Sequence, residues 1–273
     1  MRIALETARL HRSDGRQRKG SSDNAKSTVL RPQRRFVSKL GAPVTPASTP
    51  RSRSLESSRD DAAAPAFDAV FQESLAALFR WRRDVRRFRP DPIDMQVIEE
   101  LVGLATLAPS VGHSQPWRFV IVETSERRDA VVANFNACNA AALANYDGAE
   151  AALYARLKLA GLCEAPVHLA VFCDCAPAAG RGLGRMTMPE TLAYSVVGAV
   201  QNLALAARAR GLGIGWVSIL DPREIAAILE IPADWRFISY LCIGRAVEEH
   251  LDPELERHGW QARLPQSAVL QRR

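Results

Sequence analysis

Residues 188–220, "MPETLAYSVVGAVQNLALAARARGLGIGWVSIL", contain the longest apolar segment of the chain and decide its fold class. The apolar residues recur at helical spacing, which predicts a long buried helix over residues 189–210. Gly211 and Gly213 end this helix, and "IGWVSIL" is then typical of a strand. In a dinucleotide-binding βαβ unit, the glycine-rich turn follows a strand and opens a helix. The motif "GLGIG" has the reverse order and does not indicate that fold.

Three other apolar runs predict strands, namely "WRFVIVET", "VHLAVFC" and "FISYLCIG". "VHLAVFC" is almost continuously apolar, as in a strand that is buried on both faces. Helices are predicted from Phe67 to about Arg83, after an Asp94 N-cap, at 126–145 and 148–164, and after Asp221, where Pro222 and Glu224 fit the first turn of a capped helix. Helices and strands do not alternate regularly, and no P-loop is present. The sequence therefore predicts one α+β domain over residues 66–273.

Residues 1–65 differ in composition from the rest of the chain. They hold 14 Lys/Arg and 6 Asp/Glu, a local charge of +8, within a chain of net charge +6. The remaining 22 basic and 24 acidic residues give the rest of the chain a charge of −2. Because this segment is also rich in Ser, Pro and Gly, we expect a disordered basic extension. The nearly neutral domain is not expected to bind a specific nucleic acid.

The apolar segments and the cysteines indicate a cytoplasmic protein without a membrane contact. The most apolar window, residues 191–213, contains Gln201, Asn202 and two arginines, which does not suit a membrane span. The five cysteines follow no metal-site spacing and lie mostly in apolar segments. We therefore expect them to pack in the core, and we expect no metal.

The segment "FRWRRDVRRF", residues 79–88, places five arginines around a single acid, Asp84. If the segment is helical, two pairs of arginines lie four residues apart and share a face. Guanidinium groups suit phosphate because they donate two parallel hydrogen bonds. Composition alone favours the alternative of a solvated helix face, in which Asp84 pairs with Arg80 or Arg87.

Two further segments have the composition of a binding site. "APSVGHSQPW", residues 108–117, is typical of an ordered loop with exposed backbone amides, and Gly112 allows a flat ligand to approach the main chain. Ser195 lies in the long apolar helix, where a hydroxyl commonly bonds to the carbonyl four residues earlier. No GxSxG motif surrounds it, so it is not expected to be a hydrolase nucleophile.

Taken in order, "RRDVRRF", "APSVGHSQPWRFVIV", "YSVVGAVQNLALAARARGLGIGWVSI" and "GWQARLP" resemble the nitroreductase-like flavoprotein superfamily. Within it, "RRDVR", the helix that bears Ser195 and "GIGWVSI" are more specifically similar to the flavin-fragmenting 5,6-dimethylbenzimidazole synthase family, also called the BluB family. Ordinary nitroreductases usually carry Ser at the position of Asp84. The resemblance covers about residues 70–265.

This resemblance implies a domain-swapped homodimer, with a central mixed, mainly antiparallel sheet flanked by helices and with FMN at the subunit interface. Arginines would hold the FMN phosphate and ribityl chain, a backbone N–H of the 108–117 loop would face the reactive edge of the ring, and the end of the "GIGWVSI" strand would offer donors to the other edge. The implied FMN-binding residues are Arg82, Arg83, Arg86, Ser110, Gly112, Val217, Ser218 and Arg263.

The implied reaction consumes the flavin. FMNH2 reacts with O2 and is broken into 5,6-dimethylbenzimidazole, the lower ligand of vitamin B12, and erythrose 4-phosphate. Asp84 and Ser195 are the implied catalytic residues, because a carboxylate and a hydroxyl near the flavin can move protons. Neighbouring arginines would lower the pKa of Asp84 and weaken it as a base. Asp84 therefore acts either as a base beside a neutralising phosphate or as an ionised orienting group.

Residues 145–165 lie where the family places a segment that covers the flavin. If this covering excludes NAD(P)H, a separate NAD(P)H:flavin reductase must supply FMNH2. The main alternative is an NAD(P)H-dependent FMN nitroreductase that retains its flavin, and Asp84 argues against it. A more remote alternative is a non-catalytic module that binds flavin or nucleic acid.

Overall fold

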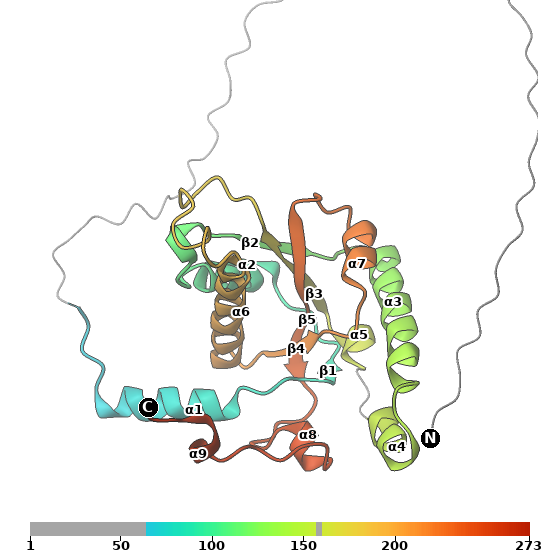
Figure 1. Ribbon diagram of the computed structural model, residues 1–273. Coiled ribbons are helices and arrows are strands. Elements are labelled where there is room, and N and C mark those ends of the chain that lie inside the picture. Colours follow the sequence, from blue (N-terminus) through green and yellow to red (C-terminus); the bar gives the residue numbers. More distant parts are fainter. Residues whose placement is uncertain (1–63, 157–159) are drawn as a thin grey trace, which may run out of the picture. The chain divides into compact units, whose positions relative to one another are not determined.

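The computed structural model describes residues 64–156 and 160–273, so residues 1–63 of the predicted extension lie outside the described part. A five-stranded sheet forms the centre of the domain (Figure 1). Its strands are β1 (Phe88–Arg89), β2 (Trp117–Ile121), β3 (Val167–Asp174), β4 (Gly213–Val217) and β5 (Trp235–Ala246).

The sheet has the order β1-β5-β3-β2, and β4 also pairs with β5. The pairings between these strands are antiparallel. A single bridge between Asp84 and Ile214 is parallel. The prediction of a mainly antiparallel sheet flanked by helices is therefore confirmed, whereas a mixed sheet is not found among the described strands, because the parallel bridge lies outside them. Strand β3 is buried along its whole length, as its continuous apolar run predicted.

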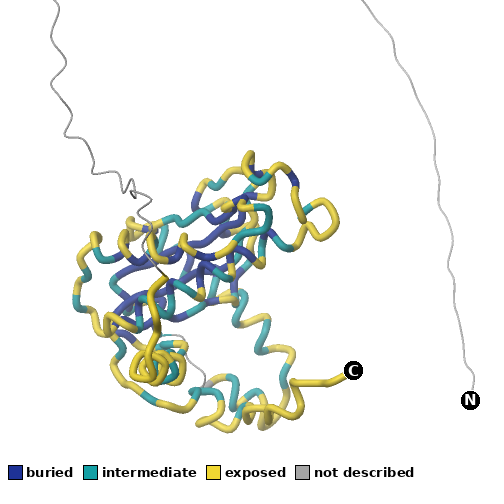
Figure 2. The backbone as a smooth tube through the Cα atoms, turned by 90° about the vertical axis from the view of Figure 1, so that its left-hand side faces the viewer, coloured by how far each residue is buried: buried dark blue, intermediate teal, exposed yellow. Residues whose placement is uncertain are grey.

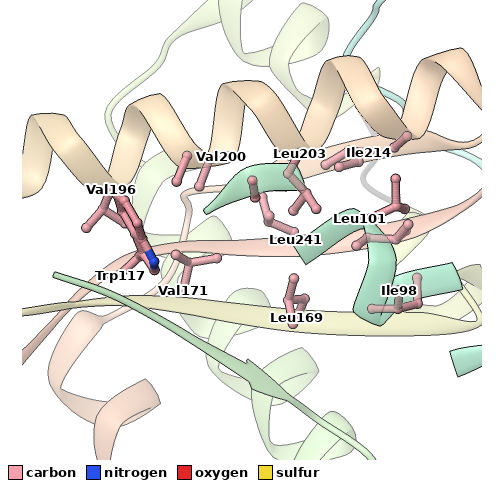
Figure 3. Packing of buried hydrophobic residues seen from close by; sticks show 14 of the residues in the cluster. Ile98, Leu101, Trp117, Leu169, Val171, Val196, Val200, Leu203, Ile214 and Leu241 are labelled. Atoms are coloured by element: carbon pink, nitrogen blue, oxygen red, sulfur yellow. The ribbon is translucent and has the colours of Figure 1, made fainter. Parts of the chain in front are cut away.

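Helices cover both faces of the sheet (Figure 1). On one face, α2 (Met95–Ala105) and α6 (Thr191–Ala209) pack against β3, β4 and β5 through a cluster that includes Leu101, Leu203 and Leu241 (Figure 3). On the other face, α3 (Ser125–Leu143), α5 (Gly161–Glu164) and α7 (Pro222–Ile228) enclose a second cluster. Side chains of β3 alternate between the two clusters, because successive residues of a strand point to opposite faces.

The remaining elements lie at the edge of this core. They are α1 (Ala69–Trp81), the short 3-10 helix η1 (Val111–His113), α4 (Gly148–Arg156), α8 (Glu254–Arg257) and α9 (Gln266–Val269). Helix α1 has no buried residue, and Val70, Phe71 and Phe79 are exposed on it. The C-terminal segment, residues 251–273, is also exposed over most of its length (Figure 2). Within the described residues, none of the helices has the length and apolar character that a membrane crossing requires.

The predicted helix caps are confirmed, with one difference. The side chain of Asp94 accepts a hydrogen bond from Gln96 N, and that of Asp221 accepts from the first backbone amides of α7. Glu224 does not return to its own cap as a capping-box acid does. Its carboxylate instead accepts from Asn134 of α3, whose amide oxygen accepts from Asp221 N. Glu224 thus pairs with a residue of the neighbouring helix α3, whereas the local pattern predicted that it would pair with the cap of its own helix α7.

The helix predicted from Phe67 to about Arg83 is found as α1, but the helical arrangement considered for the arginine segment does not occur. Helix α1 ends at Trp81, and the chain from Arg82 to Arg87 has no helical conformation. The reason is tertiary: the backbone N–H of Val85 donates to Ile214 O of β4 at 3.0 Å. The argument that arginines four residues apart share a helix face therefore does not apply.

The expectation for the cysteines holds only in part. Cys173 and Cys242 are buried, whereas Cys163 and Cys175 are exposed. Among the residues that the structure describes, no group of His, Cys, Asp and Glu is arranged to hold a metal ion.

Candidate active site

The extended segment Arg82–Arg87 lies against the start of β4, and glycines make this approach possible. A Cβ atom on Gly215 would collide with the carbonyl oxygen of Val85, and one on Gly213 would collide with the Val85 side chain. Gly213 and Gly215 of "GLGIG" therefore serve the packing of this segment and do not form a nucleotide-binding turn. They fix the place of Asp84 relative to β4.

Asp84 is held on β4 by a backbone hydrogen bond. The N–H of Trp216 donates to Asp84 Oδ1 at 2.8 Å. Surrounding protein atoms raise the pKa of the Asp84 carboxyl above its ordinary value, and the Trp216 N–H and then the Arg86 and Arg82 guanidiniums oppose this change. The side chain keeps 44% of its surface exposed, so water limits the effect. The sequence could not decide whether the arginines dominate the pKa of Asp84. In the structure burial has the larger effect.

Arg83 lies among charged side chains of both signs. Burial lowers its pKa, as do the charges of Arg82 and Arg263, whereas the charges of Asp252 and Glu256 raise it. Arg83 Nε donates to Leu251 O at 2.9 Å, and its Nη2 donates to Arg80 O. The segment after β5 therefore contacts the arginine segment at Leu251, and a phosphate contact of Arg263 stays a prediction. A cluster of cations around a partly buried arginine fits a phosphate group, which would compensate their repulsion.

Arg86 has different neighbours from the other arginines. Its Nε lies 3.9 Å from Asp84 Oδ2 and 3.8 Å from Glu254 Oε2, and its side chain is only 13% exposed. Arg86 is therefore engaged by two carboxylates in this structure, and a contact with phosphate stays a prediction.

Two adjoining pockets open beside Asp84. The first lies between the arginine segment, the C-terminal half of α6 at Gln201–Arg208, and residues 246–250. The second has a volume of ≈ 420 Å³ and lies between residues 83–87 and the 248–258 segment. The residues that line both pockets are Arg83, Asp84, Val85, Glu248 and His250. Arg208 lines the first pocket, where its guanidinium donates to both oxygens of Glu249 at 2.6 and 2.9 Å.

The predicted loop of residues 108–117 is anchored on α6. Ser195 Oγ accepts from Val111 N at 3.0 Å and donates to Thr191 O at 2.7 Å, which confirms the predicted bond to the carbonyl four residues earlier. Gly112 has φ +56°, and a Cβ there would approach Leu183 O to 2.8 Å and Gly180 O to 2.9 Å. Glycine is thus needed for the turn and for packing against residues 180–183.

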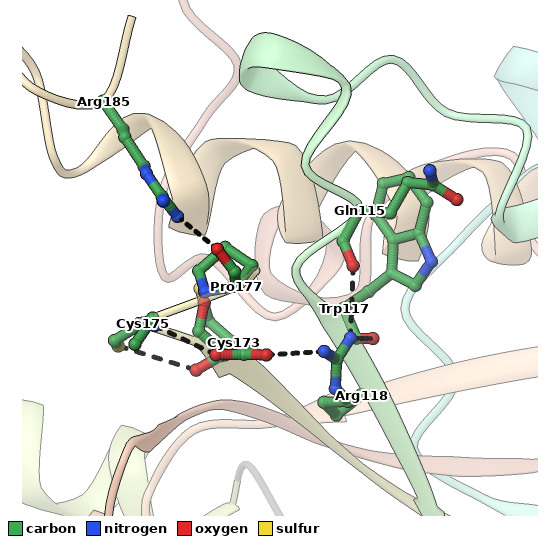
Figure 4. Close-up of polar contacts among 9 residues, drawn as sticks. Gln115, Trp117, Arg118, Cys173, Cys175, Pro177 and Arg185 are labelled. Carbon is green, nitrogen blue, oxygen red and sulfur yellow. Dashed lines mark hydrogen bonds and ion pairs between the residues drawn. The ribbon is translucent and has the colours of Figure 1, made fainter. Parts of the chain in front are cut away.

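The same loop is closed at its other end by hydrogen bonds (Figure 4). The hydroxyl of Ser110 accepts from Gln115 N at 3.0 Å. Arg118 donates to the carbonyl oxygen of Gln115 at 3.1 Å and to the Asp174 carboxylate at 2.5 Å. The loop is therefore tied to both β2 and β3, and its backbone amides have fixed directions.

The sequence profile of the nitroreductase family matches residues 79–245. This match spans more than half of the chain and includes both the arginine segment and the Gly112 loop. The chain belongs to the nitroreductase family.

Curated relatives within this nitroreductase family confirm the more specific resemblance. A protein of Rhodospirillum rubrum named 5,6-dimethylbenzimidazole synthase is 58% identical over 205 residues, which cover 75% of this chain and 97% of the relative. A protein of the same name from Rhodobacter capsulatus is 50% identical over 201 residues, which cover 73% of this chain and 96% of the relative.

A solved structure of the same fold also has a flavin. Iodotyrosine deiodinase bound to FMN and 3-iodo-L-tyrosine matches with a TM-score of 0.54 and 26% identity, covering 64% of this chain and 91% of that chain.

The nitroreductase-family chain does not bring all predicted site residues to one point. Asp84 shares a pocket with the C-terminal half of α6, whereas Ser195 lies in the first turns of that helix. The six residues from Ser195 to Gln201 span about 9 Å along a helix. Val217, the buried last residue of β4, and the exposed Ser218 lie just beyond Trp216, near Asp84. The chain thus contains two separate regions of predicted site residues. We call them the arginine half-site, which is built on residues 82–87, and the Gly112 half-site, which is built on residues 108–117.

Sequence reasoning missed two residues that contact this site. Trp216 acts through its backbone N–H, which any non-proline residue offers, so its side chain gave no signal. Glu254 lies 168 positions beyond Arg86 and is one of several acids in its neighbourhood. Only the fold shows that its carboxylate meets Arg86.

Proposed function

We propose that the chain acts as a 5,6-dimethylbenzimidazole synthase, with FMNH2 and O2 as its substrates and erythrose 4-phosphate as the second product. The observation that carries this proposal is the position of Asp84, which lines a pocket together with Arg82 and Arg83 and lies 3.9 Å from Arg86 Nε. The 58% identity to a relative of that name over nearly its full length supports it. When bound, reduced FMN supplies the reaction with O2 that leads to fragmentation of its own ring system.

The arginine half-site binds and orients the flavin in this proposal. Arg82, Arg83 and Arg263 hold the phosphate, and Arg86 keeps the Asp84 carboxylate in place. Asp84 Oδ2 accepts and returns a proton, since a pKa raised by its surroundings makes the carboxylate a better base than a free aspartate. Val217 and Ser218 present backbone groups of the neighbouring β4 end to the ring.

The Gly112 half-site has a rigid, positioning role. Its Gly112 N–H faces the reactive edge of the ring, and Ser110 helps to close the loop. The hydroxyl of Ser195 already donates to Thr191 O and accepts from Val111 N, and its side chain is buried. We therefore assign Ser195 the task of holding the loop, which narrows the catalytic role that the resemblance implied for it.

The separation of the two half-sites supports a homodimer with FMN at its interface. Tyr194 and Val197 leave apolar surface exposed on α6, and α1 adds Val70 and Phe71. Apolar surface of this extent is typical of an interface. A two-fold axis would bring the arginine half-site of one chain to the Gly112 half-site of its partner. Light scattering of the purified chain tests this assembly, and a monomer that binds FMN with full affinity would contradict it.

A separate NAD(P)H:flavin reductase is proposed as the source of FMNH2. Helix α4, within the predicted covering segment, is held by an aromatic cluster of Tyr146, Tyr154 and Trp260. Residues 157–159 of that segment lie outside the described part. Efficient turnover with NADPH and FMN, in the absence of any reductase, would contradict this proposal.

The decisive experiment supplies chemically reduced FMN to the purified chain in air. We expect 5,6-dimethylbenzimidazole and erythrose 4-phosphate, detected by mass spectrometry, in amounts that scale with enzyme. Recovery of only reoxidised FMN, together with NADPH-dependent reduction of a nitroaromatic compound, would instead identify a nitroreductase that retains its flavin. A reaction without protein controls for spontaneous flavin breakdown.

A further inference from the structure

Two carboxylates share one arginine at the edge of the arginine half-site. Arg86 Nε lies 3.9 Å from Asp84 Oδ2 and 3.8 Å from Glu254 Oε2. Arg86 is 13% exposed and Glu254 is 25% exposed, so this contact is shielded from water more than a surface ion pair. Glu254 begins α8 and therefore reaches Arg86 from the C-terminal segment, not from the arginine segment itself.

A shared cation cannot compensate both carboxylates fully. Both carboxylates are attracted to the same guanidinium, and each repels the other when both are ionised. In an environment from which protein atoms exclude part of the water, this repulsion is stronger than at an open surface. The negative charge of Glu254 therefore makes the ionised form of Asp84 less favourable.

The other charged groups around Asp84 do not replace the role of Glu254. Arg82 is a cation on the same segment and opposes Glu254. The pKa of the Cys242 thiol of β5 is raised, first by burial and then by the charge of Asp84. The pockets beside Asp84 also include Arg83, Arg208, Glu248, Glu249 and His250. Arg208 is bound by Glu249, and His250 Nε2 lies 3.0 Å from Glu248 Oε2. Glu254 is thus the carboxylate that shares a cation with Asp84.

We infer that Glu254 is a positioning residue which, through the shared Arg86, raises the pH at which Asp84 exchanges its proton. The pKa direction agrees with this geometry: burial is the largest cause of the raised pKa of Asp84, and the charge of Glu254 adds a smaller change in the same direction.

The test is a titration of Asp84 in the folded chain without flavin. Asp84 is followed by carboxyl 13C NMR of 13C-aspartate-labelled protein and is assigned from the spectrum of Asp84→Asn. We expect Glu254→Gln to move the Asp84 midpoint to lower pH, because a repelling charge is lost and Arg86 is freed for Asp84. Glu254→Asp keeps the charge and should restore the midpoint at least in part.

Glu248→Gln is the matched control, because it removes a carboxylate from the same pockets without touching Arg86. We expect it to leave the Asp84 midpoint unchanged. An Asp84 midpoint that stays in place in Glu254→Gln, or moves equally in Glu248→Gln, overturns the inference. A loss of structure in Glu254→Gln would show in its 13C spectrum, and Glu254→Ala, which also removes the charge, then takes its place in the test.

The consequence for catalysis rests on the proposed function and is measured separately. The pH profile of 5,6-dimethylbenzimidazole formation should shift to lower pH in Glu254→Gln, in parallel with the Asp84 midpoint. If the parent chain forms no product, the proposed function fails, while the titration still decides whether Glu254 tunes Asp84. If the midpoint shifts and the pH profile does not, Asp84 has no proton-transfer role.

Discussion

The two half-sites of the chain are held in place by opposite physical means. The arginine half-site is an extended segment whose side chains are partly exposed and contact one another through charge, as in the Asp84, Arg86 and Glu254 group. The Gly112 half-site is a loop held by a buried hydroxyl, by a glycine at positive φ and by hydrogen bonds to the sheet. The first depends on pH and salt, and the second depends on packing.

This difference indicates a division of labour. Proton transfer requires a group whose charge can change, and such a group must keep some contact with water and with other charges. Orientation of a flat ring requires backbone groups that do not move, which buried hydrogen bonds provide. Substitutions in the two half-sites should therefore affect different measurements.

The largest effect is expected for Asp84→Asn. The amide keeps the shape of the side chain and can still accept from Trp216 N, but it cannot accept a proton. We expect product formation to fall by about 100-fold or more, with FMN affinity nearly unchanged. Product formation at the parental rate would show that Asp84 is structural.

Stability gives an independent measurement on the same variant. Because the pKa of Asp84 is raised in the folded state, its contribution to stability is fully present below the unfolded-state pKa and is lost as the pH rises through the folded-state pKa. At neutral pH, Asp84→Asn should therefore unfold at the same temperature as the parent or at a higher one. A clear destabilisation at neutral pH that disappears in acid would contradict this sign.

A smaller effect, on binding, is expected for Arg83→Ala. Loss of one charge-assisted phosphate contact costs about 1.5–3 kcal/mol, which corresponds to roughly a 10- to 150-fold weaker affinity for FMN. Fluorescence titration of FMN measures it. The matched control is Arg89→Ala, because Arg89 is an exposed arginine of β1 that pairs with Asp91 at 2.6 Å. Equal losses in both variants would refute a phosphate site at Arg83.

The smallest effect on chemistry is expected for Ser195→Ala. It leaves the N–H of Val111 without its acceptor, which costs about 1–3 kcal/mol of stability. FMN affinity should fall through disorder of the Gly112 loop, while the pH profile of product formation keeps its midpoints. Thr106→Ala is the control, because the Thr106 hydroxyl also donates to a backbone carbonyl but is exposed. A shifted pH profile in Ser195→Ala would return Ser195 to a proton-transfer role.

Patterns with a local cause predicted much of this molecule. The apolar period of residues 189–210 predicted α6, the continuous run at β3 predicted burial on both faces, and Asp94 and Asp221 predicted helix starts. In each case the physical cause, side-chain periodicity or capping of free amides, lies within a few residues of its effect. The same locality explains why the bond from Ser195 to Thr191 could be foreseen.

By itself, the sequence determined which residues are candidates for chemistry and, through resemblance to a family, the arginines and the single acid that the proposed reaction needs. Only the tertiary structure decided how these residues meet. Pairing with β4 makes the arginine segment extended, and Gly213 and Gly215 of "GLGIG" allow Val85 to pack closely against them. The C-terminal segment brings Glu254 to Arg86. These outcomes depend on contacts between segments far apart in the chain, and neither propensity nor spacing encodes the distance between two such segments.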